Sequence, residues 1–188
     1  RQLTIESAKR AGLPRIILIE EPQAAFYAWV HRHADNWQEQ VQAGQKILVC
    51  DIGGGTSDFT LIRASANETT GDVQFNRIAV GEHLILGGDN LDLTLARHIE
   101  TKLVGDDRLP AYQWEVLVRT ARRVKETLLG ENPPDTITVN LPAGGSKLIG
   151  GGLQTAVTRS EVEELLLEGF LPRVCLNDKP QRKQSAFQ

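Results

Sequence analysis

Two apolar segments joined by three consecutive glycines constrain the fold more than any other feature of this sequence. The run ILVC at residues 47–50 and the run FTLI at residues 59–62 both have the composition of strands. Gly53, Gly54 and Gly55 lie between them, so they form a hairpin turn and do not lead into a helix. This excludes the dinucleotide-binding fingerprint, which needs a following helix, and the P-loop, which needs a Gly-Lys-Ser/Thr sequence.

The turn also carries the groups expected of a phosphate and metal site. Glycines present successive N–H groups to an anion at close range, and Thr56 adds a hydroxyl donor. Asp51 and Asp58 flank the turn and would repel a phosphate if nothing lay between them. Mg²⁺ removes this conflict, because it takes carboxylate, water and phosphate oxygens together. A tight hairpin with two solvated acids is the alternative that the turn alone leaves open.

The rest of the chain alternates helical and strand patterns, which predicts an α/β architecture. Strands are expected at residues 15–20, 46–52, 58–64, 73–80, 136–142 and 153–158. Helices are expected at residues 2–11, 22–33, 89–103, 112–129 and 160–174. The unbroken apolar run at residues 46–52 predicts a strand buried on both faces.

Local signals predict how some of these elements begin and end. Asp89 or Asn90 is the expected cap of the helix that starts there, and Ser160 with Glu163 forms an expected capping box. The glycine-rich segment at residues 144–152 lies between two strands with no acid nearby, so it is expected to be a mobile hairpin loop and not a second phosphate site.

Composition excludes several classes of protein. A formal net charge of -3 gives no electrostatic case for nucleic acid, and no apolar run approaches the length of a membrane span. Cys50 and Cys175 are far apart in the sequence, so a disulfide framework is not expected. Both cysteines are instead expected to pack in the interior, and a reducing, cytoplasmic setting is expected for the protein. The absence of Met and an opening in mid-helix pattern predict a fragment of a longer protein.

The four histidines give no metal site by spacing. His31 and His33 are two residues apart on a predicted helix, so they point in different directions and are expected to be solvated. His83 and His98 have no partner at ligand spacing, and the sequence assigns them no role.

Six segments, in this order along the chain, resemble the nucleotide-binding domain of the DnaK-type 70-kDa heat-shock chaperones. They are IEEPQAAFYAW, DIGGGTSDFTLI, GGDNLDLTLARHI, RTARRVKETL, ITVNLPAGG and VTRSEVEELL. That family belongs to the actin-like ATPase superfamily, and the resemblance covers most of residues 1–175. It implies part of an actin-like ATPase (ribonuclease H-like) fold, comprising the end of the first lobe and most of the second.

The resemblance also implies a division of the chain. Residues 1–44 would end the first lobe, and residues 45–80 with 159–175 would form the base of the second. Residues 81–158 would be the cap of that lobe, and residues 176–188 a polar tail.

Roles at the turn follow from the resemblance, position by position. Gly53, Gly54, Gly55 and Thr56 match the second phosphate-binding hairpin of the family. Asp51 matches the acid that holds Mg²⁺ through water.

Further roles come from matching positions elsewhere. Asp58 matches a second acid close to the metal, and Glu21 matches an acid near the attacking water. Gly87 and Gly88 match a glycine pair that approaches the nucleotide, and Lys125 matches a lysine near the ribose.

The sequence departs from the family at three points. Arg122, Glu126 and Leu129 stand where the family has a glutamate, an arginine and a serine around the adenosine, which leaves the preference for adenine open. The segment at residues 81–88 is one residue longer than in the family. The first-lobe phosphate hairpin and its catalytic lysine would precede Arg1, so the chain alone is expected to hydrolyse ATP negligibly.

The function implied is that of part of the ATP-binding domain of a chaperone that couples ATP binding and hydrolysis to protein folding. ATP or ADP and Mg²⁺ are the expected cofactors. The expected partners are unfolded polypeptides and co-chaperones, and neither nucleic acid nor a membrane is an expected partner. A bacterial actin-like filament protein shares the glycine turn and the Glu-Glu-Pro sequence, so it remains an alternative. A nucleotide-sensing scaffold of the same superfold is another, and turnover of ATP is left open.

Overall fold

The computed structural model describes residues 2–67, 73–142 and 152–179. The chain divides into two compact units, unit 1 (Arg1–Gly88) and unit 2 (Asp89–Gln188), which are described separately. Nearly all of the predicted glycine-rich loop at residues 144–152 lies outside the described residues.

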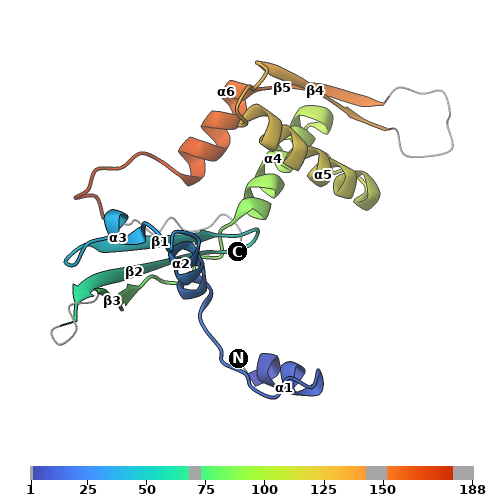
Figure 1. The fold of residues 1–188 in the computed structure, drawn as a ribbon. Helices are drawn as coiled ribbons and strands as arrows, with labels where there is room; N and C mark the ends of the chain where they lie inside the picture. The colour runs from blue at the N-terminus through green and yellow to red at the C-terminus, as the bar shows by residue number, and fades with distance from the viewer. Residues whose placement is uncertain (1, 68–72, 143–151, 180–188) are drawn as a thin grey trace. The chain divides into compact units, whose positions relative to one another are not determined.

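Unit 1 holds a three-stranded antiparallel sheet in the order β1-β2-β3 (Figure 1). Its strands are β1 (Lys46–Ile52), β2 (Ser57–Ala66) and β3 (Val73–Val80). Its helices are α1 (Gln2–Arg10), α2 (Glu21–Arg32) and α3 (Trp37–Gln40). Three of the four strands predicted for this unit, and both of its predicted helices, are confirmed.

Helix α2 covers one face of this sheet. Pro22 lies in its first turn, where a missing N–H costs no hydrogen bond. Phe26 is buried and meets Phe75 of β3 edge-on, with 4.8 Å between ring centroids. Thr60 and Ile62 of β2 are buried and line the same small cavity as these two rings. The α2 face is therefore the face that carries Thr60 and Ile62.

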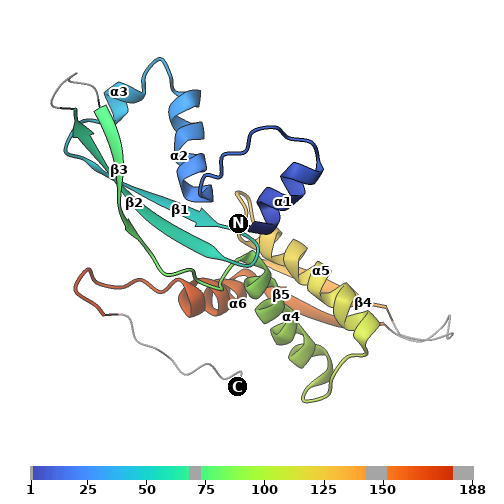
Figure 2. The same ribbon diagram turned by 90° about the horizontal axis from the view of Figure 1, so that it is seen from below.

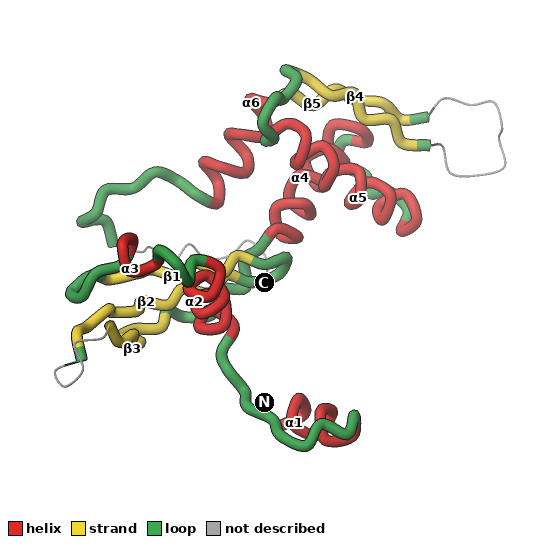
Figure 3. The backbone as a smooth tube through the Cα atoms, in the orientation of Figure 1, coloured by secondary structure: helices red, strands yellow, loops and turns green. Residues whose placement is uncertain are grey.

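The predicted strand at residues 15–20 is wrong. Figure 3 shows a loop there, between α1 and α2. Ile17 is 78% exposed, and no strand in the described part of the chain pairs with this segment. An apolar run forms a strand only where a neighbour supplies hydrogen-bonding partners, and composition does not reveal that neighbour.

The prediction that β1 is buried on both faces is also wrong. Leu48 and Ile52 are 59% and 66% exposed, and they alternate with half-buried residues. The strand lies at the edge of the sheet with α2 on one side only. Cys50 is exposed on it, and Cys175 is exposed as well; both thiols are free, so the packing role predicted for them is not confirmed.

Unit 2 buries an apolar core against a two-stranded antiparallel hairpin (Figures 1 and 2). Its elements are α4 (Gly88–Val104), α5 (Ala111–Leu128), β4 (Thr136–Leu141), β5 (Leu153–Thr158), α6 (Arg159–Val162) and a π-helical turn, η1 (Glu163–Glu168). The buried residues of α5 recur at helical spacing, at Leu117, Ala121, Val124 and Leu128. None of the helices in the described ranges is both long and apolar enough to cross a membrane.

Two predicted caps differ from those observed. Helix α4 begins at Gly88, so Asp89 lies in its first turn, where an acid favours the helix dipole. The capping box that precedes α6 is formed by Thr158 and Glu161, not by Ser160 and Glu163. The correct box starts two residues earlier because β5 ends at Thr158, and the sequence offers both pairs at the same spacing.

The Thr158–Glu161 box predicts a dependence of unit 2 stability on pH. Burial raises the pKa of Glu161, but hydrogen bonds from Lys102 and from Thr158 outweigh it and bring the pKa to about 2, below the ordinary 4.5. The depressed pKa means that this stabilisation is present above about pH 4.5 and is lost as the pH falls toward 2. Glu161→Gln should lower the free energy of unfolding by about 1 kcal/mol at pH 7 and by much less at pH 2.5. Urea unfolding of the native chain and the variant at both pH values measures this difference. An equal loss of stability at pH 7 and pH 2.5 would contradict the role of the Glu161 carboxylate.

Candidate functional site

The glycine turn is a four-residue connection between β1 and β2. The Gly53 N–H donates to the Thr56 carbonyl oxygen at 2.8 Å, which closes the turn. Gly53, Gly54 and Gly55 are all exposed. The described glycines with left-handed backbone are Gly12, Gly44 and Gly105, none of which belongs to the turn. The turn therefore does not need glycine for its backbone angles, and its glycines leave the peptide surface bare.

A second segment, residues 81–88, packs against the turn; we call it the strap. Leu84 and Ser57 form an antiparallel bridge, with the Ser57 N–H donating to the Leu84 oxygen at 2.9 Å and the Leu84 N–H to the Ser57 oxygen at 3.1 Å. The Ser57 hydroxyl donates to the Leu86 oxygen at 2.7 Å. The strap is thus fixed beside the first residue of β2.

The end of the strap lies against the glycine turn. The Gly88 N–H donates to the Gly53 oxygen at 3.1 Å. A Cβ on Gly87 would lie 2.4 Å from the Gly54 oxygen and 2.6 Å from the Gly53 oxygen, closer than real Cβ contacts. Only a glycine therefore fits at position 87. The structure brings the predicted pair Gly87 and Gly88 directly onto the predicted phosphate turn.

The two aspartates face each other across the hairpin. Asp51 and Asp58 are register partners in the antiparallel pairing of β1 and β2, as are Val49 and Thr60 two residues away. Both carboxylates therefore lie on the α2 face, and both residues are half-buried. Like charges directly opposite one another destabilise a sheet, so the pair needs a compensating group.

A hydrated divalent cation fits this pair. Two carboxylates are hard oxygen donors, which suit Mg²⁺. In the described part of the chain no three His, Cys, Asp or Glu side chains gather closely enough to hold a metal. In the predicted site, the two acids would therefore supply part of the coordination shell, and water and phosphate would supply the rest.

The remaining predicted residue of unit 1 is Glu21. It is exposed in the first turn of α2, the helix that covers the face of the aspartate pair. Its neighbour Glu20 forms an ion pair with Arg77 of β3, which ties the start of α2 to the sheet.

Lys125 belongs to unit 2, where it forms an ion pair with Asp92 of α4 (Nζ–Oδ1 2.5 Å). Both side chains are largely buried, at 14% and 6% exposure. On the exposed face of α5, Arg122 pairs with Glu126 at 3.1 Å, and this hydrogen bond raises the pKa of Arg122. Two of the three positions that depart from the family thus bind each other.

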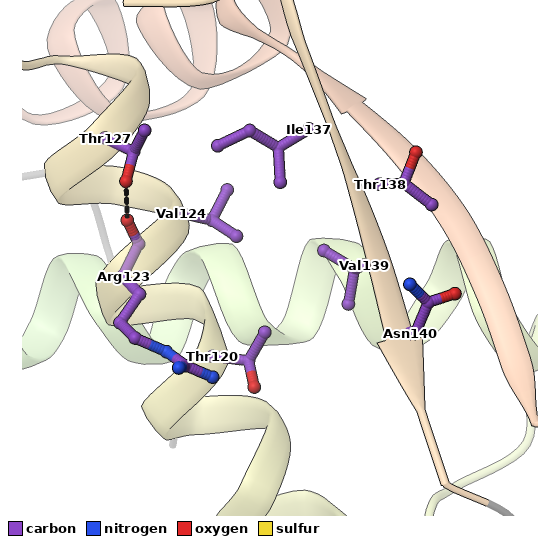
Figure 4. Close-up of a pocket in the computed structure, with 8 residues that line it drawn as sticks. All are labelled: Thr120, Arg123, Val124, Thr127, Ile137, Thr138, Val139 and Asn140. Carbon is purple, nitrogen blue, oxygen red and sulfur yellow. Dashed lines mark hydrogen bonds between the residues drawn. The ribbon is translucent and has the colours of Figure 1, made fainter.

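Unit 2 also has a groove between α5 and β4 (Figure 4). Figure 4 shows the side chains of Val124, Ile137 and Val139 between α5 and β4, with the Arg123 side chain running toward Thr120. The Thr127 hydroxyl already donates to the Arg123 carbonyl oxygen at 2.8 Å. No predicted site residue lines this groove, so the turn and the strap remain the better candidate.

The perturbed acid Glu100 is structural. It is 1% exposed, and although burial raises its pKa, the Leu109 N–H and the side chains of Arg97 and Arg108 lower it below the ordinary value. Their hydrogen bonds measure 2.9, 2.7 and 2.9 Å. These three donors all belong to unit 2, so Glu100 holds α4 to the loop before α5.

Sequence reasoning missed His83. Its Nδ1 lies 2.8 Å from Oδ1 of Asp58, although the two residues are 25 positions apart. The one sequence feature that could have drawn attention to His83 is the length of the strap, which is one residue longer than the corresponding segment in the family.

Comparison with known proteins identifies relatives. The Hsp70 protein family model matches residues 1–177. The chain is 32% identical to the chaperone protein HscA homolog of Pseudoalteromonas atlantica over 89% of its own length and 24% of the relative's. It is 31% identical to the chaperone protein DnaK of Stenotrophomonas maltophilia over 95% of its length and 28% of the relative's. The chain thus spans about a quarter of the length of the curated relatives it matches. It belongs to the Hsp70 family of chaperones.

Proposed function

We propose that this chain forms part of the ATP-binding domain of a cytoplasmic, DnaK-like chaperone, and that the glycine turn binds the phosphates of ATP or ADP. The observation that carries the proposal is the packing of Gly87 against Gly53 and Gly54, beside the Asp51–Asp58 pair. Two features assigned from separate parts of the sequence, the hairpin at residues 51–58 and the glycine pair at residues 87–88, meet at one end of one sheet. In this proposal the chain covers the end of the first lobe and most of the second, as divided above.

Each residue of the site has a defined task. The backbone N–H groups near Gly54 and Gly55 and the Thr56 hydroxyl donate to phosphate oxygens. Asp51 and Asp58 would hold hydrated Mg²⁺, and Glu21 would orient the attacking water. Bound Mg²⁺ would neutralise charge on the phosphates. Catalysis then depends on positioning and on electrostatic stabilisation.

Lys125 lies in unit 2, and its assignment to the ribose rests on the family relationship alone. Asp92 holds the Lys125 ammonium in place, which fits a lysine that must be presented in a fixed orientation. Coupling of nucleotide state to polypeptide clients and co-chaperones is the remaining part of the proposal, and it rests on family membership.

An actin-like filament protein is the second candidate, because the glycine turn is shared. The test uses the gene product that contains these residues at its natural length. A chaperone should show Mg²⁺-dependent ATP hydrolysis that an unfolded peptide stimulates, and ATP should not make it sediment. Sedimentation with ATP and no response to peptide would support the filament protein instead.

A further inference from the structure

We propose that His83 is a positioning residue that holds the Asp58 carboxylate in place for the cation. This inference rests on the proposed function, since it concerns the same acid pair. It assigns a role to a residue that neither the sequence pattern nor the family resemblance singles out.

The strap fixes the position of the imidazole. The Gly81 N–H donates to the Phe59 oxygen at 2.8 Å, and Leu84 bridges Ser57. His83 lies between these two anchors, both of which are on the strand that carries Asp58. The 2.8 Å contact between Nδ1 and Oδ1 is therefore part of a docked backbone arrangement, although the imidazole itself is 61% exposed.

The contact opposes the repulsion between the two carboxylates of the acid pair. Asp58 stands opposite Asp51, and repulsion between the carboxylates favours rotamers that turn them apart. An Nδ1–H group that donates to Oδ1 of Asp58 opposes this rotation and leaves Oδ2 with its lone pairs available. Outer hydrogen bonds of this kind orient ligating carboxylates in metal sites.

The contact also connects the acid to the phosphate turn. The strap that carries His83 ends at Gly87 and Gly88 on the turn. One segment thus sets both the position of Asp58 and the packing of the glycines, so the cation and phosphate positions share one support.

The test is a Mn²⁺ titration of the 188-residue chain, followed by paramagnetic broadening of backbone amide signals. His83→Leu removes the donor. His83→Asn restores a donor near the position of Nδ1, whereas His83→Gln places it near that of Nε2 and serves as the matched control. His31→Leu removes an exposed histidine of α2 and controls for loss of a surface imidazole.

We expect the amides of Asp51 and Asp58 to broaden first in the native chain. His83→Leu and His83→Gln should raise the Mn²⁺ midpoint about tenfold, the low end for outer-shell partners of metal ligands. His83→Asn should stay within about threefold of the native value, and His31→Leu should not change it.

Two kinds of negative result are distinguishable. If His83→Leu matches the native chain, or if Asn and Gln at this position behave alike, the positioning role is wrong while the cation site stands. If Mn²⁺ broadens neither aspartate in the native chain, the cation site itself is wrong, and the proposed function and the role of His83 both fail.

Discussion

Gly87→Ala is expected to separate the strap from the glycine turn and to abolish phosphate binding there. The new methyl would overlap the backbone oxygens of Gly53 and Gly54, at 2.6 and 2.4 Å, and backbone atoms cannot rotate away. Relief requires the strap to move, which breaks the Gly88–Gly53 hydrogen bond. Overpacking of this kind costs about 1–3 kcal/mol. Urea unfolding followed by the fluorescence of Trp29 and Trp37, both in unit 1, measures the loss.

Gly55→Ala is the matched control. A Cβ at this position meets nothing within 4 Å, and the backbone is not left-handed. The free energy of unfolding should therefore change by only about 0.5 kcal/mol. The methyl nevertheless occupies the bare surface of the turn, so phosphate binding should still weaken. If Gly87→Ala unfolds like the native chain, the close packing of strap on turn is wrong. If Gly55→Ala binds phosphate normally, the glycines serve the hairpin alone.

The sequence predicted the elements that have a strong local pattern. Apolar composition located β2 and β3, and a helical repeat located α5 almost to its ends. The glycine turn was predictable because its two strands are adjacent in sequence and must pair across it. The secondary structure of each of these elements depends on residues within a few positions along the chain. A single sequence is therefore enough to predict them.

Features that depend on distant partners could not be predicted. The apolar run of β1 suits a central strand as well as an edge strand, and only the sheet order decides which faces are covered. The segment at residues 15–20 has the composition of a strand but no strand beside it in the described part of the chain. The contact of His83 with Asp58 depends on the path of the strap, which no local pattern encodes.

Asp51→Asn is expected to stabilise the metal-free chain while removing the Mg²⁺ dependence of nucleotide binding. The substitution removes the charge opposite Asp58, so the hairpin should gain up to about 1 kcal/mol. The same change removes a hard anionic ligand, so Mg²⁺ should no longer favour ATP at the turn. A residue that improves function at the cost of stability gives this opposite pair of effects.

Asp35→Asn provides the control, because it removes one exposed carboxylate of unit 1 in the turn after α2. It should leave both stability and Mg²⁺ dependence unchanged. A loss of stability in Asp51→Asn, measured without Mg²⁺, would mean that the carboxylate has a structural partner and is not reserved for a cation.

The most direct measurement of the central claim is an amide-shift titration of the 188-residue chain with ATP, with and without Mg²⁺. We predict that the largest shifts fall on the glycine turn and on Gly87 and Gly88, that Mg²⁺ increases them, and that Asp51→Asn abolishes the increase. Shifts of equal size without Mg²⁺, or shifts confined to residues away from the turn and the strap, would contradict the assignment of this turn as a Mg²⁺–nucleotide site.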